Sequence, residues 1–317
     1  MKVTQQLHDL GQSLWLDNIT RDLLDNGTLK RYIDEFSVTG LTSNPTIFEH
    51  AISKSKSYDA EIRRMVSNGL SGEELFFELA LQDLTRAADL FASVHDRTAG
   101  NDGYVSLEVS PLLAYDVDRS LTAAATLHKK GNRSNLFIKI PGTKEGNVAI
   151  EKATAAGVAI NVTLLFSREH YLESASAYMR GLELRIDTGL SPDIRSVASV
   201  FVSRWDGATI DKVPEGLRDR LGIGIGKQIY KAYRDPAGLG PLAAFGELRR
   251  AAPKTPVCQY RHKRPESFGR SLYRWPSCAE HDQHHAGKNS SGPWRSWPPG
   301  WNASARWRGL RSCSRGL

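Results

Sequence analysis

Over residues 1–234, short apolar runs alternate with longer stretches in which apolar residues recur every three or four positions. Runs of the first kind are typical of buried strands, and stretches of the second kind are typical of amphipathic helices. We predict strands at residues 14–19, 38–43, 104–109, 136–140, 159–166 and 197–202, and the clearest helices at residues 72–94, 117–129, 147–156, 168–180 and 223–233. Nearly continuous apolar strands separated by helices predict a parallel sheet covered by helices. Because no domain break interrupts the alternation, we expect a (β/α) barrel rather than an open sheet.

The alternation ends too early for a complete barrel, which needs roughly 250 residues. No strand is predicted after Arg234, so about six of the eight β/α units of a (β/α)8 barrel lie within residues 1–234. We therefore expect an α/β fold with an incomplete barrel at 1–234 and a largely disordered tail at 235–317. A barrel without its last two strands has two open sheet edges, which predicts poor folding and low activity.

The tail differs from the rest of the chain in charge and composition. Residues 235–317 contain 14 Lys and Arg against 5 Asp and Glu, a net charge of +9; subtraction from the totals of 42 and 35 leaves 28 against 30, or −2, for residues 1–234. The basic character of the chain therefore belongs to the tail. Basic residues interleaved with tryptophan would suit contacts with nucleic acid. A non-catalytic product with a nucleic-acid-binding tail is thus one alternative interpretation.

The cysteines are also confined to the tail, at Cys258, Cys278 and Cys313, so disulfides contribute nothing to the fold of residues 1–234. The N-terminus lacks the apolar core of a signal peptide, and no segment is apolar for long enough to span a bilayer. We expect a cytoplasmic protein with no membrane partner. The sequence leaves open whether it is a monomer or a homodimer.

Polar side chains cluster where the predicted strands end, which is where barrels of this kind have their active sites. This candidate set comprises Asp17, Asn44, Glu108, Lys139, Asn161, Thr163, Ser199, Phe201 and Arg204.

Lys139 lies between Ile138 and Ile140 in a predicted buried strand. Burial of an ammonium group is costly and favours the neutral amine, which is the form that attacks a ketone carbon. Glu108 and Asp17 could then move protons, directly or through a water. An equally plausible interpretation of Lys139 alone is an ion pair with a carboxylate on a neighbouring strand. The clustering of functional groups at five consecutive strand ends favours the nucleophile.

Four motifs carry a family resemblance. They are Gly-Leu-Thr-Ser-Asn-Pro-Thr-Ile-Phe at 40–48, Leu-Phe-Ile-Lys-Ile-Pro-Gly-Thr-Lys-Glu-Gly at 136–146, Asn-Val-Thr-Leu-Leu-Phe-Ser at 161–167 and Ser-Val-Phe-Val-Ser-Arg at 199–204. Over residues 1–234 the chain resembles the transaldolases, in the form with a long helical insertion after the second strand. Asn147 departs from the family pattern, in which this position is usually aliphatic. The resemblance implies a (β/α)8 TIM barrel of the class I aldolase type.

The resemblance also implies a reaction and a set of roles. The reaction is the transfer of a dihydroxyacetone unit from sedoheptulose 7-phosphate to glyceraldehyde 3-phosphate, without a metal or organic cofactor. Lys139 would form the Schiff base, Asp17 would move the proton for carbon–carbon cleavage, and Glu108 and Thr163 would hold a water. The donor's hydroxyls would bind Asn44, Asn161 and Ser199, and its phosphate would bind Arg204. Phe201 replaces the tyrosine of related aldolases that release free dihydroxyacetone, which argues against the alternative of a dihydroxyacetone-dependent aldolase.

The tail lacks the last two motifs that the family resemblance predicts. When residues 258–266 are back-translated and shifted by one base, they can read Ala-Ser-Thr-Gly-Thr-Lys-Asp-Pro-Lys; residues 279–288 similarly give Pro-Asn-Thr-Ile-Asn-Thr-Met-Pro-Glu-Lys. Both are motifs that the family would have there. We infer a single-nucleotide insertion or deletion near the codon for Arg234, which resequencing of the gene would test. The metal-like cluster of Cys278, His281, His284 and His285 is then explained by out-of-frame coding.

Overall fold

The computed structural model of the chain describes residues 2–234 and the backbone of two further segments, 256–259 and 271–274. Eight strands form a closed ring in sequence order. They are β1 (Ser13–Asp17), β2 (Val38–Thr42), β3 (Val105–Glu108), β4 (Leu136–Pro141), β5 (Ile160–Leu165), β6 (Ser196–Phe201), β7 (Pro256–Gln259) and β8 (Ser271–Arg274). The first six match the six predicted strands.

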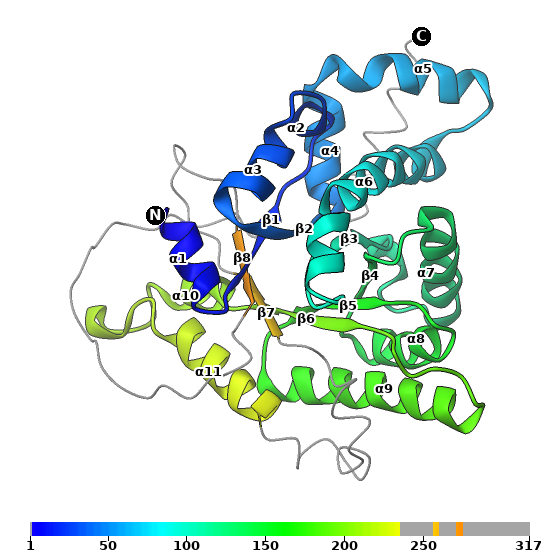
Figure 1. The fold of residues 1–317 in the computed structure, drawn as a ribbon. Helices are drawn as coiled ribbons and strands as arrows, with labels where there is room; N and C mark the ends of the chain where they lie inside the picture. Colours follow the sequence, from blue (N-terminus) through cyan, green and yellow to red (C-terminus); the bar gives the residue numbers. More distant parts are fainter. Residues whose placement is uncertain (1, 235–255, 260–270, 275–317) are drawn as a thin grey trace.

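Strands β1 to β6 pair in parallel, each with the next in sequence, and helices connect them. The helices are α1 (Val3–Asp9), α2 (Arg21–Asp25), α3 (Thr28–Phe36), α4 (Pro45–Lys54), α5 (Asp59–Ser67), α6 (Gly72–Arg97), α7 (Val117–Gly131), α8 (Lys144–Ala155), α9 (Arg168–Asp187), α10 (Ser203–Thr209) and α11 (Leu221–Arg234), with single 3₁₀ turns η1 (Lys56–Tyr58), η2 (Pro111–Leu113) and η3 (Glu215–Leu217). Helices α6 to α9 lie on the outer side of the strands (Figure 1). The predicted α/β architecture with six barrel units is confirmed.

The ring is closed by two strands that the sequence analysis did not predict. β7 pairs in parallel with β6, whereas β8 is antiparallel to both β7 and β1. The prediction of two open edges is therefore wrong for the backbone. Unpaired N–H and C=O groups at a sheet edge can bond to any extended backbone, whatever its side chains, so this closure needs no apolar strand pattern. An antiparallel eighth strand does not belong to a regular (β/α)8 barrel, in which all eight strands are parallel.

The apolar residues form two main layers, one outside the ring and one inside it. The outer core lies between strands and helices and includes Leu16, Ile138 and Val200. Inside the ring, at the end where the strands begin, a separate cluster comprises Trp15, Tyr104, Phe137, Ala159 and Val197. We call this cluster the aromatic floor. Because it fills the ring at that end, the functional groups must lie beyond it, toward the carboxyl ends of the strands.

Gly40 in β2 makes room for the aromatic floor. A Cβ atom at this position would lie 2.4 Å from Nε1 of Trp15. Trp15 is almost fully buried, and its ring stacks on Phe137 with centroids 6.3 Å apart. The indole also donates a hydrogen bond from Nε1 to Asp102 Oδ1 at 2.9 Å, so the ring cannot shift freely. The glycine is required by this close approach.

Gly40→Ala is accordingly expected to destabilise the protein by about 1–3 kcal/mol, the usual cost of overpacking a close-packed core. The measurement is the midpoint of urea unfolding, followed by tryptophan fluorescence. Gly224→Ala in α11 is the control, because a Cβ there meets no atom within 4 Å. An unchanged midpoint for Gly40→Ala would contradict the proposed need for glycine.

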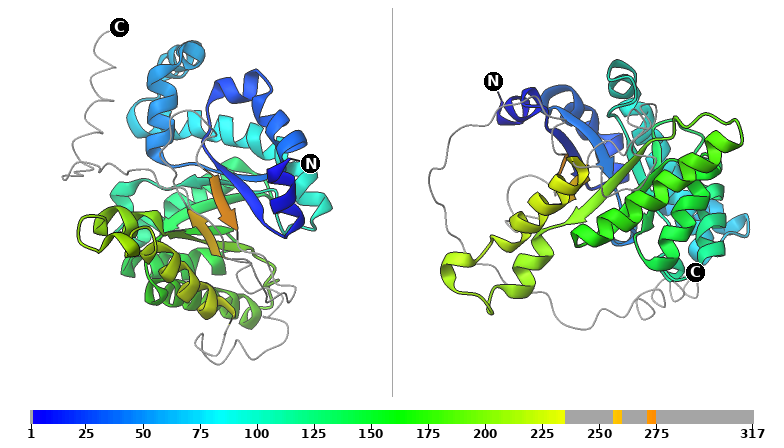
Figure 2. Two further views of the ribbon diagram at one scale, coloured as in Figure 1. Left: turned by 90° about the vertical axis from the view of Figure 1, so that its left-hand side faces the viewer. Right: turned by 90° about the horizontal axis from the view of Figure 1, so that it is seen from below.

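The connection between β2 and β3 is the longest excursion from the ring. It contains α4, η1, α5 and α6, which lie beside α2 at one end of the molecule (Figures 1 and 2). A separate small core of Ala51, Tyr58, Met65 and Leu79 holds α5 against α6. This excursion is the long helical insertion that the sequence predicts after the second strand.

None of the helices in the described part of the chain is both long enough and apolar enough to cross a bilayer. The side chains of Cys258, Cys278, Cys313, His281, His284 and His285 lie outside the described residues, as does most of the predicted tail. The predicted boundary at Arg234 stays a prediction, because the residues that directly follow it lie outside the described part of the chain.

Candidate active site

The inward-facing side chains of the barrel can be identified from the aromatic floor. Side chains alternate between the two faces of a strand, so residues two and four positions after a floor residue share its inward face. Two positions beyond the floor lie Asp17, Ser106, Lys139, Asn161 and Ser199, all buried. Four positions beyond it lie Glu108, Thr163 and Phe201. The sequence prediction that these side chains face the same interior is therefore consistent with the register of the structure.

Lys139 lies in the middle of β4 and is only 5% exposed. Its Nζ lies 3.0 Å from Glu108 Oε2 on β3 and donates a hydrogen bond to the carbonyl oxygen of Ser43 at 3.1 Å. Residues 108 and 139 are direct partners in the β3–β4 register. The contact expected from the ion-pair interpretation is thus present. It also gives the amine a carboxylate that can accept its proton, as a nucleophilic lysine requires.

A chain of hydrogen bonds crosses three strands beside Lys139. Asn161 on β5 donates from Nδ2 to the Ser106 hydroxyl at 3.0 Å, and its Oδ1 accepts from the Ser199 hydroxyl at 2.8 Å. Both ends of the Asn161 amide are bonded, which fixes its orientation. Ser106 was not among the predicted site residues. Its position two residues before Glu108, on the same face of β3, is the signal that could have identified it.

Asp17 is the last residue of β1 and is 2% exposed. It pairs in register with Thr42 on β2, which in turn pairs with Ser106 on β3. The buried hydroxyls of Thr42 and Thr163 have no hydrogen-bond partner among the described residues. Buried hydroxyls of this kind are suited to bind a water or a substrate oxygen. This property fits the role predicted for Thr163.

Asn44 has a structural task that the sequence analysis did not assign to it. It precedes Pro45 at the start of α4, and its Oδ1 accepts a hydrogen bond from the backbone N–H of Ile47 at 3.0 Å. This is an N-cap, which satisfies one of the free N–H groups at the helix start. The amide nitrogen of Asn44 keeps its donor capacity for a ligand.

Phe201 and Arg204 lie together at the exit of β6. The Phe201 ring is 5.5 Å from the ring of Phe166, and the guanidinium carbon of Arg204 lies 5.5 Å from the Phe201 ring centre. Arg204 is the second residue of α10 and is exposed, which allows it to contact an anion in solvent. No group of three or more His, Cys, Asp and Glu side chains suited to a metal occurs within the described residues.

Comparison with known proteins identifies the family. The sequence profile of the transaldolase/fructose-6-phosphate aldolase family matches residues 14–264, which is most of the chain and extends beyond Arg234. The chain belongs to this family. The predicted resemblance to the transaldolases is confirmed.

Individual transaldolases are similar over most of the chain. A transaldolase of Arthrobacter sp. (strain FB24) is 39% identical over 279 residues, covering 85% of this chain and 75% of that protein. A transaldolase of Saccharopolyspora erythraea is 42% identical over 238 residues, covering 73% and 64%, and one of Thiobacillus denitrificans is 41% identical over 261 residues, covering 78% and 72%. The chain thus matches between about two thirds and three quarters of the length of these transaldolases.

These matches support a transaldolase, an enzyme of the transferase class. They give no support to a non-catalytic nucleic-acid-binding product or to a dihydroxyacetone-dependent aldolase. Family membership does not by itself assign a role to any single side chain.

Proposed function

We propose that this chain transfers a dihydroxyacetone unit from sedoheptulose 7-phosphate to glyceraldehyde 3-phosphate, giving erythrose 4-phosphate and fructose 6-phosphate through a Schiff base on Lys139. The observation that carries the proposal is the buried Lys139 amine 3.0 Å from Glu108, on the inward face of a barrel strand. A lysine in this setting has a proton acceptor, low water access and neighbours that can bind hydroxyls.

The reaction begins when Glu108 takes a proton from Lys139 and the neutral amine attacks the C2 ketone of the donor. The resulting carbinolamine loses water to give a protonated imine. Glu108 and Thr163 hold this water and assist its departure and return. The Thr163 hydroxyl is buried on the inward face of β5 and has no hydrogen-bond partner in the described part of the chain, so it is suited to this task.

Carbon–carbon cleavage follows on the imine. Asp17 takes the proton of the C4 hydroxyl, the C3–C4 bond breaks, and its electron pair moves into the iminium to give an enamine. Erythrose 4-phosphate leaves as the aldehyde. Glyceraldehyde 3-phosphate then accepts the enamine carbon while Asp17 returns the proton, and hydrolysis of the imine releases fructose 6-phosphate and restores the Lys139 amine.

The remaining candidate residues bind the donor. Asn161 and Ser199 are already oriented by their mutual hydrogen bond. Together with the amide nitrogen of Asn44, they are proposed to bind the hydroxyls of the dihydroxyacetone unit. Arg204, exposed at the exit of β6, is proposed to bind the phosphate through its planar donor groups. The substrates are therefore sugar phosphates.

Borohydride trapping with fructose 6-phosphate tests the proposal. Reduction of the imine fixes the three-carbon or six-carbon unit on the lysine, and mass spectrometry of the digested protein locates it. We expect a slowly formed adduct at Lys139 in the 317-residue chain and faster turnover in a protein whose shifted frame has been restored, because the native final β/α units complete the site. No adduct at Lys139 in either protein would refute the proposed mechanism.

Phe201→Tyr is expected to raise the release of free dihydroxyacetone without an acceptor, by at least about 10-fold, because a phenol can act as a second acid where phenylalanine cannot. The assay follows dihydroxyacetone formed from fructose 6-phosphate alone. Phe166→Tyr adds the same hydroxyl to the neighbouring ring and serves as the control. Equal release from both variants would contradict a special position for residue 201.

A cytoplasmic location and either a monomer or a homodimer are consistent with this proposal. The lack of cysteine in residues 1–234 suits a reducing compartment. Fractionation of cells and analytical ultracentrifugation would test the two points.

A further inference from the structure

Helix α2 follows Asp17 after only three residues, 18–20. The position of α2 therefore affects the short loop that directly follows Asp17. Thr20 caps the helix by accepting a hydrogen bond from the N–H of Leu23 at 3.1 Å, and Ile19 is fully buried in the outer core. The helix itself has only five residues and is too short to be stable alone. Contacts with other elements must hold it in place.

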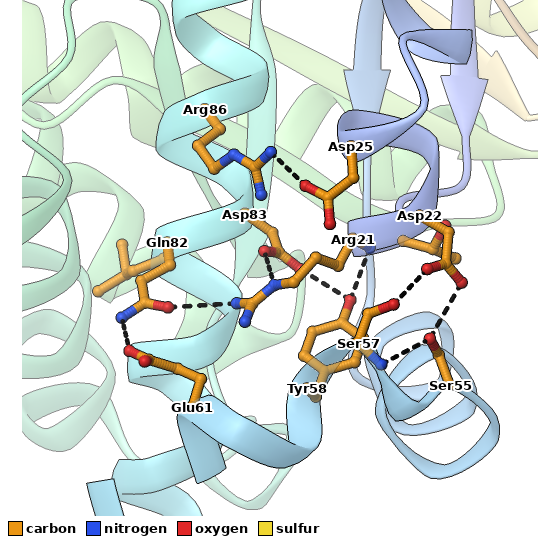
Figure 3. A network of polar contacts seen from close by, with 12 residues as sticks. Arg21, Asp22, Asp25, Ser55, Ser57, Tyr58, Glu61, Gln82, Asp83 and Arg86 are labelled. Carbon is orange, nitrogen blue, oxygen red and sulfur yellow. Dashed lines mark hydrogen bonds and ion pairs between the residues drawn. The ribbon is translucent and has the colours of Figure 1, made fainter. Parts of the chain in front are cut away.

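Three residues that are distant in sequence make the central contacts (Figure 3). Arg21 is the first residue of α2, Tyr58 ends η1, and Asp83 is fully buried on α6. Arg21 Nε donates to Asp83 Oδ1 at 2.9 Å, and the Tyr58 hydroxyl donates to Asp83 Oδ2 at 2.7 Å. The same hydroxyl accepts a hydrogen bond from the backbone N–H of Arg21 at 2.9 Å. Both carboxylate oxygens of Asp83 are thus engaged.

The geometry and the electrostatics of this cluster agree. The Arg21 guanidinium lies over the Tyr58 ring at 4.5 Å, within the range of a cation–π contact. Burial raises the pKa of the Asp83 carboxyl, and the hydrogen bond from Tyr58 and the charge of Arg21 act in the opposite direction. Burial and the nearby Asp83 raise the pKa of Tyr58, so its hydroxyl remains protonated and able to donate. Loss of any member would leave a buried polar group unsatisfied. Because that is costly, the intact cluster is rigid.

Two peripheral contacts hold the rest of α2. Ser55 and Ser57 donate hydrogen bonds to Asp22, and Arg86 donates to Asp25 at 2.5 Å. Every charged side chain of this short helix is therefore bonded to Ser55, to η1 or to α6. All these partners belong to the long insertion between β2 and β3.

We propose that Arg21, Tyr58 and Asp83 form a brace through which the helical insertion fixes the β1–α2 loop and so positions the Asp17 carboxylate for proton transfer. The brace residues are positioning residues, since they act through Asp17 and not on the substrate. The inference rests on the proposed function for the role of Asp17. It assigns the insertion a task in catalysis in addition to its own packing.

Tyr58→Phe in the 317-residue chain is the test, because it removes one hydroxyl and two hydrogen bonds while the ring stays. Tyr178→Phe is the matched control: its buried hydroxyl donates to the Ile194 carbonyl in the segment before β6, away from α2. Hydrogen–deuterium exchange measures the backbone of residues 18–22. Borohydride trapping and single-turnover release of glyceraldehyde 3-phosphate from fructose 6-phosphate measure imine formation and cleavage separately.

For Tyr58→Phe we expect exchange at residues 18–22 to rise about 10-fold and cleavage to slow about 10-fold, as for loss of a hydrogen bond to a charged group. The yield of trapped adduct should not change, since Lys139 lies on another strand. Tyr178→Phe should alter none of the three. Exchange or cleavage equal in the two variants would overturn the inference.

Two further observations keep the result decisive. If Tyr58→Phe does not fold, Arg21→Lys keeps the positive charge but loses the planar guanidinium that bonds to Asp83 and lies over the Tyr58 ring; it should raise exchange at the same residues about twofold to threefold, and unchanged exchange would overturn the brace. Absence of any adduct or cleavage in both the parent chain and the frame-restored protein would refute the proposed function. In that case the exchange data alone would still decide whether the brace holds the loop.

Discussion

Replacement of Lys139 by methionine is expected to abolish the borohydride-trapped adduct and to lower transaldolase turnover by at least about 10⁴-fold, the scale of effect seen when a covalent nucleophile is removed. Methionine keeps most of the length of the lysine side chain but has no amine. The variant also leaves Glu108 without its ion-pair partner, so some loss of stability is expected alongside the loss of chemistry.

The same variant separates the two interpretations of Lys139. A purely structural ion pair predicts a lower unfolding midpoint with the adduct still formed elsewhere, whereas a nucleophile predicts no adduct at any temperature at which the protein is folded. Lys129→Met is the control, because Lys129 is exposed on α7 outside the barrel. The adduct is measured by mass spectrometry and folding by circular dichroism. A variant at residue 139 that is still labelled on reduction would refute the assignment.

Asp17→Asn is expected to slow carbon–carbon cleavage by about 10²–10⁴-fold, the usual contribution of a positioned general base. Asparagine has nearly the shape of aspartate but cannot accept the proton of the C4 hydroxyl. Imine formation involves Lys139 and Glu108 on other strands, so the trapped adduct should still form. The variant should therefore accumulate the six-carbon adduct, which is heavier than the three-carbon adduct that remains after cleavage.

Asp102→Asn provides a control for this result. Asp102 is also buried, but it lies beside the aromatic floor, where its Oδ1 accepts the Trp15 hydrogen bond. Asp102→Asn should lower the unfolding midpoint and leave the cleavage rate within about twofold. A substitution distant from the reacting groups acts mainly on stability. Rapid-quench measurement of glyceraldehyde 3-phosphate from fructose 6-phosphate gives both rates. Similar slowing in the two variants would argue against a specific role for Asp17.

The parts of the structure that depend on local pattern could be predicted from the sequence. The six parallel strands and the longer helices follow directly from apolar periodicity. The clustering of polar groups at the carboxyl ends of strands follows from topology, and it correctly placed Glu108 beside Lys139. Strands β7 and β8 could not be predicted in this way, because backbone pairing at an exposed edge does not require a recognisable side-chain pattern.

The parts that depend on contacts between distant residues were not predicted. Ser106 shares a strand face with Glu108, but its partner Asn161 became known only from the hydrogen bond in the structure. Tyr58 and Asp83 resemble ordinary helix residues in the sequence, and their relation to Arg21 arises from the packing of the insertion against α2. Trp15 likewise reads as a simple strand residue, although it fills the interior of the ring.

The stacked rings of Trp15, Phe137 and Tyr104 have a kinetic consequence. They fill the described ring of strands at the end where the strands begin, so substrates would enter and products leave at the opposite end. The departing erythrose 4-phosphate and the arriving glyceraldehyde 3-phosphate would use the same opening in turn, while the three-carbon fragment stays bound to Lys139. A site with a single opening thus suits double-displacement kinetics, with parallel lines in reciprocal plots, in which the first product leaves before the second substrate binds.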